Sequence, residues 1–145
     1  MAVMRLELRY PATPQNAAEH AELARQVAHE EFDEQLDYSP ASLERVDLQV
    51  ESLREDGLTA EDAAEALFVL GCYLGEVMRR ALGGEWCPTA RSPLRDLSPW
   101  PMVLALRGGS AWDPIGKVYK RFELGDSEYL PAYFRAAATA AGPPR

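Results

Sequence analysis

The sequence has few of the side chains on which metal sites and nucleophilic centres depend. It contains two cysteines, Cys72 and Cys87, and two histidines, His20 and His29. The cysteines match no metal-binding or redox spacing, so we expect two free thiols, with a single disulfide as the alternative. The histidines lie about 14 Å apart along one predicted helix and cannot share a metal ion there. We predict neither a metal ion nor another cofactor.

The chain also lacks a long apolar run. Its longest nearly uncharged stretch, residues 66–75, is about half the length of a membrane span. The opening residues MAVMRLELRY have neither the apolar core nor the small-residue cleavage site of a secretory signal. We therefore expect no transmembrane helix and no secretory leader, and we predict a cytoplasmic location.

Positive charge is scarce, and lysine is scarcest. The 145 residues include 15 basic and 23 acidic side chains, which gives a net charge of −8. Such a chain repels phosphate groups, which argues against binding to nucleic acids and to an anionic membrane surface. The lysines are Lys117 and Lys120 alone, and this bias, with the many alanines, is typical of a GC-rich bacterial genome.

The acidic side chains are concentrated in the first half of the chain. Residues 15–65 hold 15 acidic and three basic side chains, a net charge of −12, whereas residues 79–145 hold six acidic and ten basic ones, a net charge of +4. The acidic part is either the solvated outside of two helices or a surface that steers a basic protein partner. For such a partner we propose contacts with Glu30, Glu31 and Glu34.

Apolar residues at helical spacing predict four or five helices. The segments are residues 15–36, 40–56, 60–82, 114–122 and 127–138. The first has a face of alanines joined by Leu23, Val27 and Phe32, and it ends in the acidic run HEEFDE. Acidic side chains at a helix C-terminus oppose the helix dipole, which points to a cation or a basic group nearby.

Alternating and apolar stretches predict a small sheet. Apolar and charged side chains alternate in residues 4–10, which is typical of a half-buried strand. Residues 102–107 form a short apolar run of the buried-strand kind, and residues 85–87 are a third, shorter candidate. We expect the N-terminal strand and residues 102–107 to form the sheet.

The predicted helix at residues 60–82 is apolar nearly all round, which indicates a central position. Gly71 and Gly75 each cost it about 1 kcal/mol of helix propensity, and close approach of another backbone would offset that cost.

Glu76 lies within this apolar helix, and a buried carboxylate is unfavourable unless it is paired. Arg79 and Arg80 are within reach, so we expect structural pairing. The alternative is a ligand-binding or catalytic pocket formed by Glu76, Tyr73 and Arg80.

A basic cluster in the second half is a candidate anion site. Lys117, Lys120 and Arg121 recur on one helix face, and Arg107 precedes a glycine turn. A glycine turn beside a helix N-terminus can bind an anion. The turn GGS matches no nucleotide-binding motif, however, and pairing with the protein's own acidic helices is the interpretation that we favour.

Most aromatic residues also lie in the second half. They fit a core layer between sheet and helices, or a partner surface, where tryptophan and tyrosine contribute much of the binding energy. Trp100 and Trp112 lie in loops beside proline or aspartate, so we predict that they are partly exposed and contact a partner.

The run GCYLGE at residues 71–76, followed by GGEW at residues 83–86, resembles a pattern in small uncharacterised bacterial proteins. In these, a long helix carrying GxYxGE ends in GGxW and is followed by a strand and a short helix. The resemblance covers residues 39–134 and implies no activity or site residue. Some small domains of this kind resemble accessory or immunity-type proteins encoded beside toxins or secretion systems.

These patterns predict a single α+β domain over residues 1–145, with four to five helices around a central apolar helix and a small β-sheet. As its function we favour a non-catalytic interaction protein that binds a protein partner, of basic character, through acidic helices and exposed aromatics. The alternative is a small enzyme or ligand-binding domain with a pocket around Glu76. The sequence leaves a homodimer open.

Overall fold

Five α-helices form the body of the domain, and 61% of the residues that the structure describes are helical. The computed structural model describes residues 8–142. The helices are α1 (Ala17–Phe32), α2 (Leu43–Glu55), α3 (Ala64–Leu82), α4 (Pro114–Leu124) and α5 (Leu130–Ala141). Together with three short strands they form one α+β domain, which confirms the predicted fold class, and each predicted helix is present with somewhat different ends.

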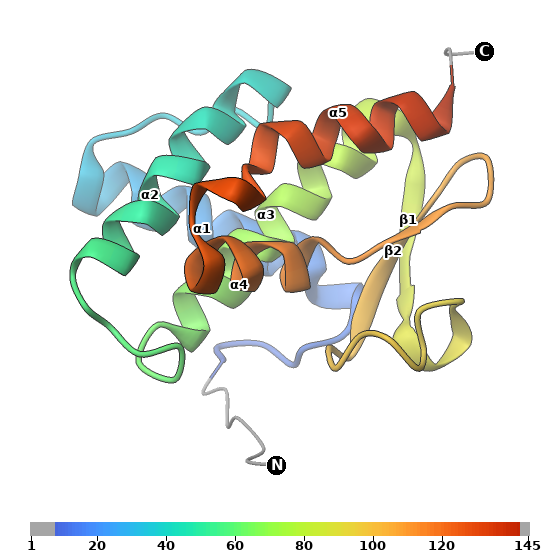
Figure 1. Ribbon diagram of the computed structural model, residues 1–145, viewed down its shortest axis with the longest axis horizontal. Helices are drawn as coiled ribbons and strands as arrows, with labels where there is room; N and C mark the ends of the chain where they lie inside the picture. The colour runs from blue at the N-terminus through green and yellow to red at the C-terminus, as the bar shows by residue number, and fades with distance from the viewer. Residues whose placement is uncertain (1–7, 143–145) are drawn as a thin grey trace.

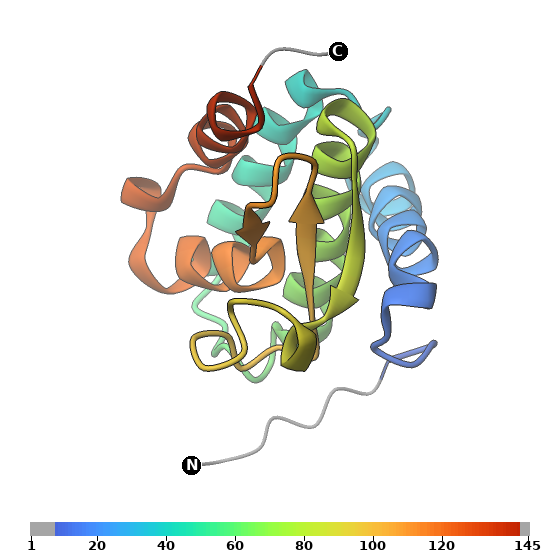
Figure 2. The same ribbon diagram turned by 90° about the vertical axis from the view of Figure 1, so that its right-hand side faces the viewer.

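The longest helix, α3, lies at the centre of the domain. Figure 2 shows α1 on one side of α3, and α4 with α5 on the other. Every residue from Leu70 to Met78 is buried, as expected for a helix that is covered on several sides. Within residues 8–142 no helix is long and apolar enough to cross a membrane.

The two glycines of α3 mark the places where its neighbours come closest. A Cβ added at Gly71 would lie 2.6 Å from the Cα of Ile115 in α4, and one added at Gly75 would lie 2.1 Å from Cζ2 of Trp86. Both distances are shorter than real Cβ contacts, so only glycine allows this packing. The predicted backbone approach is confirmed at Gly71, whereas the neighbour at Gly75 is an indole ring.

Three antiparallel strands form the sheet on the right of Figure 1, in the order β1, β2, β3. Their bounds are β1 (Gly84–Pro88), β2 (Met102–Leu106) and β3 (Ala111–Trp112). Trp86 pairs with Leu104 on one side of β2, and Leu104 pairs with Trp112 on the other. The sheet thus continues directly from the C-terminal end of α3.

Within the described residues, β2 pairs with β1 and β3 and with no part of the predicted N-terminal strand. Residues 4–7 of that predicted strand lie outside the described residues, and residues 8–10 are not in a strand. Of the two partners of β2, β1 begins where α3 ends. A Cβ added at Gly84 would lie 2.4 Å from the carbonyl oxygen of Ala105, so glycine lets the chain pass from helix to strand at this short distance from β2.

Candidate functional site

Glu76 is buried, and both of its carboxylate oxygens are paired. Nε and Nη2 of Arg79 donate to them at 2.8 and 3.1 Å, and Nε1 of Trp86 donates at 3.0 Å. Nε of Arg80 lies 3.7 Å from one oxygen. Burial by itself favours a higher pKa, but the bonds from Arg79 and Trp86 outweigh it and hold the pKa of Glu76 below its ordinary value. The expected structural pairing is confirmed.

Tyr73 and Arg80 meet through a third residue, Tyr38. The rings of Tyr38 and Tyr73 stack with their centroids 4.8 Å apart, and the guanidinium of Arg80 lies 3.7 Å from the Tyr38 centroid. The backbone N–H of Tyr38 donates to the hydroxyl of Tyr73 at 2.8 Å, and the hydroxyls of Ser42 and Tyr73 share a bond of 2.7 Å. These contacts hold Tyr38 at a left-handed φ of 63° and fix the loop between α1 and α2 on α3.

The predicted pocket of Glu76, Tyr73 and Arg80 is therefore not formed as one cavity. Glu76 borders a shallow hollow together with Arg79 and Trp86, and neither Tyr73 nor Arg80 lines it. Because the carboxylate faces three donors, its geometry is that of an anchor between α3 and β1.

The four candidate anion ligands are not brought together. Arg121 is buried and donates to Asp47 at 3.0 and 3.2 Å and to Glu51 at 2.8 Å. Lys117 pairs with Glu128. Arg107 and Lys120 are exposed.

Pairing with the protein's own acidic helices, the interpretation favoured from the sequence, is thus confirmed for Arg121, which binds carboxylates of α2, whereas the partner of Lys117 lies in the turn before α5.

Trp100 and Trp112 are both half-buried. The ring of Trp100 packs on Tyr119 with centroids 4.3 Å apart, and the ring of Trp112 meets Tyr133 edge-on at 5.3 Å. Partial exposure is confirmed, but each ring already has an aromatic neighbour within the domain. Contact with a partner through these rings stays a prediction.

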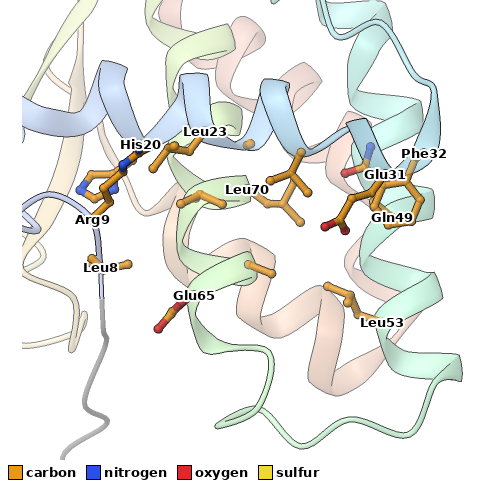
Figure 3. Close-up of a pocket in the computed structure, with 14 residues that line it drawn as sticks. Leu8, Arg9, His20, Leu23, Glu31, Phe32, Gln49, Leu53, Glu65 and Leu70 are labelled. Carbon is orange, nitrogen blue, oxygen red and sulfur yellow. The ribbon is translucent and has the colours of Figure 1, made fainter. Parts of the chain in front are cut away.

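An open apolar groove lies between α1, α2 and α3, with a volume of about 420 Å³ (Figure 3). We call it the acidic groove. In Figure 3, α1 runs along one edge, and α3 and α2 form the floor beneath it. Its walls consist of His20, Leu23, Ala24, Val27, Glu31 and Phe32 of α1, Gln49 and Leu53 of α2, Glu65, Ala66, Val69 and Leu70 of α3, and Leu8 and Arg9 at one end.

The groove exists because the apolar face of α1 is wider than the surface that covers it. The alanines of α1, such as Ala21, Ala24 and Ala28, are buried. Leu23 and Val27, beside them on the helix, project into the groove, and Val27 is 42% exposed. Phe32, at the end of the helix, is 46% exposed. Exposed apolar side chains that gather in one hollow mark a surface whose burial against a partner lowers the free energy.

The acidic residues predicted to meet a partner lie at one end of this groove. Glu31 lines it, and Glu34 accepts a hydrogen bond at 2.8 Å from Gln49, which also lines it. Glu30 is exposed beside them but is not part of the wall. On α3, Glu65 adds a further carboxylate to the groove.

The C-terminal end of α1 carries negative charge that the described residues do not compensate. Glu30 and Glu31 lie in its last turn, and Asp33 follows at the C-cap. None of the ion pairs formed within residues 8–142 involves these three carboxylates. Since the helix dipole is itself negative at this end, a cation placed here would be stabilised.

His20 closes the opposite end of the groove from the inside. It is fully buried, its Nε2 lies 3.0 Å from the carbonyl oxygen of Pro11, and its ring meets Phe68 edge-on at 5.0 Å. Its Nδ1 has no hydrogen-bond partner among the described residues. Leu8 and Arg9 form the outer part of this end.

No local pattern in the sequence indicates the groove. Leu23, Val27 and the acidic run after them belong to separate patterns of the sequence. Their contact with Leu53 and Val69 depends on how α1 crosses α2 and α3. The signal that could have revealed it is the unusual width of the apolar face of α1.

Comparisons of the chain with models of protein families, with curated proteins and with solved structures find no match. The resemblance carried by GCYLGE and GGEW therefore stays a prediction, and the groove is the feature from which a function can be argued.

Proposed function

We propose that this protein is a non-catalytic interaction protein and that the acidic groove binds a basic, amphipathic helix of a partner protein. The single observation that carries the proposal is an apolar floor, left uncovered by residues 8–142, with carboxylates at its edges. Peptide helices are recognised in such grooves through apolar anchors spaced three and four residues apart.

The shape of the groove supports a helical occupant. From His20 to Phe32, α1 rises through about 18 Å, which is the length of three to four helical turns. The walls are helices, so their side chains form ridges into which a further helix can pack. Val27 and Phe32 would lose their exposed surface on docking, which is the main favourable term.

The charge of the groove supports a basic occupant. Glu31 and Glu65 lie in the groove, and Glu30 and Asp33 are exposed at its end. Residues 15–65, which supply the lining residues of α1 and α2 and Glu65 of α3, carry a net charge of −12. A basic helix would be steered towards this surface and an acidic one repelled.

The polar side chains that line the groove support a binding role over a catalytic one. Among the described residues that line it there is no serine, threonine, cysteine or lysine to serve as a nucleophile. Figure 3 places Glu31 and Glu65 on different sides of the groove, separated by Leu70.

The test uses synthetic peptides of about 14 residues, long enough to fill the groove as a helix. One has leucines at i, i+3, i+4, i+7 and i+8 with lysines elsewhere, and its counterpart has glutamates in place of the lysines. Fluorescence anisotropy measures the affinity of each for the full chain. We expect the lysine peptide to bind and the glutamate peptide to bind at least about tenfold more weakly.

Two matched variants locate the site. Val27→Ser removes an exposed apolar side chain from the groove, and Leu124→Ser removes one, 61% exposed, from the end of α4. We expect only Val27→Ser to lower the affinity for the lysine peptide. Equal effects of the two variants would overturn the proposal. So would a concentration-dependent dimer that Val27→Ser abolishes, because the groove would then belong to a second copy of this chain.

A further inference from the structure

The two ends of the acidic groove differ in charge, and the difference follows the direction of α1. The end at Glu31 carries negative charge only, from the carboxylates of Glu30, Glu31 and Asp33 and from the C-terminal dipole of α1. The other end carries Arg9 on the chain before α1, with Glu65 of α3 on the same side of the groove (Figure 3).

A helix that occupies the groove also has two different ends. Its first turn has N–H groups without intrahelical partners and a partial positive charge, and its last turn has unpaired carbonyl groups and a partial negative charge. Glu31 can accept from such N–H groups, and the guanidinium of Arg9 can donate to such carbonyls. These pairings are available in only one direction of docking.

We propose, on the basis of the function proposed above, that the groove binds its partner helix antiparallel to α1. The N-terminus of the partner then lies at Glu31 and its C-terminus lies at Arg9. In the parallel direction, the partner's carbonyl groups would face the carboxylates at the end of α1, and its N–H groups would face Arg9. Glu31 and Arg9 are thus the residues that determine the direction of docking.

Geometry favours the same arrangement. A helix that lies along α1 packs with its dipole against the dipole of α1, and antiparallel dipoles attract. The groove floor gives no preference of its own, because its residues Leu53 and Val69 are apolar. Direction is therefore left to the charged ends.

The experiment uses the lysine peptide, acetylated and amidated so that it has no terminal charges, with a nitroxide spin label at either end. Amide signals of the ¹⁵N-labelled full chain are recorded with each label. We expect the N-terminal label to broaden the signals of Glu30, Glu31 and Phe32, and the C-terminal label to broaden those of Arg9 and His20. The reverse pattern, or equal broadening from both labels, would overturn the proposed direction while leaving docking in the groove intact.

A charge-exchanged variant provides the second arm. In the double variant Arg9→Glu, Glu31→Arg, both substituted residues are exposed, so the fold should be kept. Because Glu30, Asp33 and the dipole of α1 are kept, we expect the preference for one direction to weaken, so that each label broadens signals at both ends of the groove. An unchanged pattern would show that these residues do not set the direction. Absence of peptide binding to the unmodified chain would overturn the proposed function and this inference together.

Discussion

Trp86 donates a hydrogen bond from its indole Nε1 to the carboxylate of Glu76 at 3.0 Å, and its ring covers the face of α3 at Gly75. The glycine, the glutamate and the tryptophan therefore form one contact between α3 and β1. The glycine makes room for the ring, and the buried carboxylate fixes its orientation. Two predictions concern this contact.

Gly75→Ala should destabilise the fold although alanine is the better helix former. The added Cβ would lie 2.1 Å from the ring of Trp86, which its bond to Glu76 holds in place. Overpacking costs about 1–3 kcal/mol, more than the gain of about 1 kcal/mol in helix propensity. Urea unfolding measures the difference. In the background Trp86→Ala the same substitution should cost much less, and a stabilising effect of Gly75→Ala in the unmodified chain would refute the steric role of the ring.

Glu76→Gln should lower stability by about 2 kcal/mol or more at neutral pH, since the amide presents a donor where three donors converge. The pKa of Glu76 in the folded protein lies below its ordinary value of 4.5. Its charge therefore stabilises the fold above about pH 4.5, and this contribution is lost as the pH falls below that value.

Unfolding curves recorded between pH 7 and pH 3 check this expectation. The gap in stability between the unmodified chain and Glu76→Gln should be constant near neutrality and should narrow in acid. Glu85→Gln, at an exposed position of β1, is the control and should open no such gap. A gap that widens in acid would show that the carboxylate is not held in its charged form.

Arg121→Leu should be among the most damaging single substitutions outside the apolar core. It leaves the buried carboxylate of Asp47 with the backbone N–H of Leu130 as its remaining partner in the described structure. Breaking a buried ion pair on one side costs about 3–5 kcal/mol. The measurement is again urea unfolding, with the exposed Arg135→Leu as the control.

The double variant Arg121→Leu, Asp47→Asn separates charge from packing. It should recover part of the loss, because the asparagine removes the buried charge and its amide oxygen can still accept from Leu130. A double variant that is less stable than Arg121→Leu alone would mean that the unpaired charge is not the cause.

The sequence predicted the parts of the fold that follow from local patterns. The apolar periodicity of residues 60–82 indicated the central helix, and the spacing of Glu76 from Arg79 and Arg80 indicated its pairing. The pairing of β1 with β2 does not follow from local patterns alone. Residues 85–87 form a shorter run than the alternating residues 4–10, so the pattern alone does not favour them as the strand beside β2. The close approach of Gly84 to Ala105 is a tertiary contact that the local sequence does not indicate.

The sequence indicated individual residues of the candidate site but not their assembly into a groove. The acidic run indicates Glu31 and Glu34 as partner-binding residues, and the apolar periodicity of residues 15–36 includes Val27. Their assembly into one groove depends on the angle at which α1 crosses α3 and on the side chains of α2 that it leaves uncovered. Such crossing angles are set by packing and not by periodicity.

The measurement that tests the proposed docking most directly is the stability and peptide affinity of one variant, Glu31→Lys. A lysine in the last turn of α1 complements the helix dipole, so the urea midpoint of the free protein should rise slightly. The affinity for the lysine peptide should fall about threefold to tenfold, because an attraction is replaced by a repulsion.

Glu123→Lys is the matched control, since Glu123 is exposed in the last turn of α4 and does not line the groove. It should raise the urea midpoint in the same way and leave the affinity unchanged. We predict that both variants are more stable than the unmodified chain and that only Glu31→Lys binds the lysine peptide more weakly. This result would show that Glu31 serves recognition and not stability. Equal peptide affinities in the two variants would contradict docking at the acidic groove.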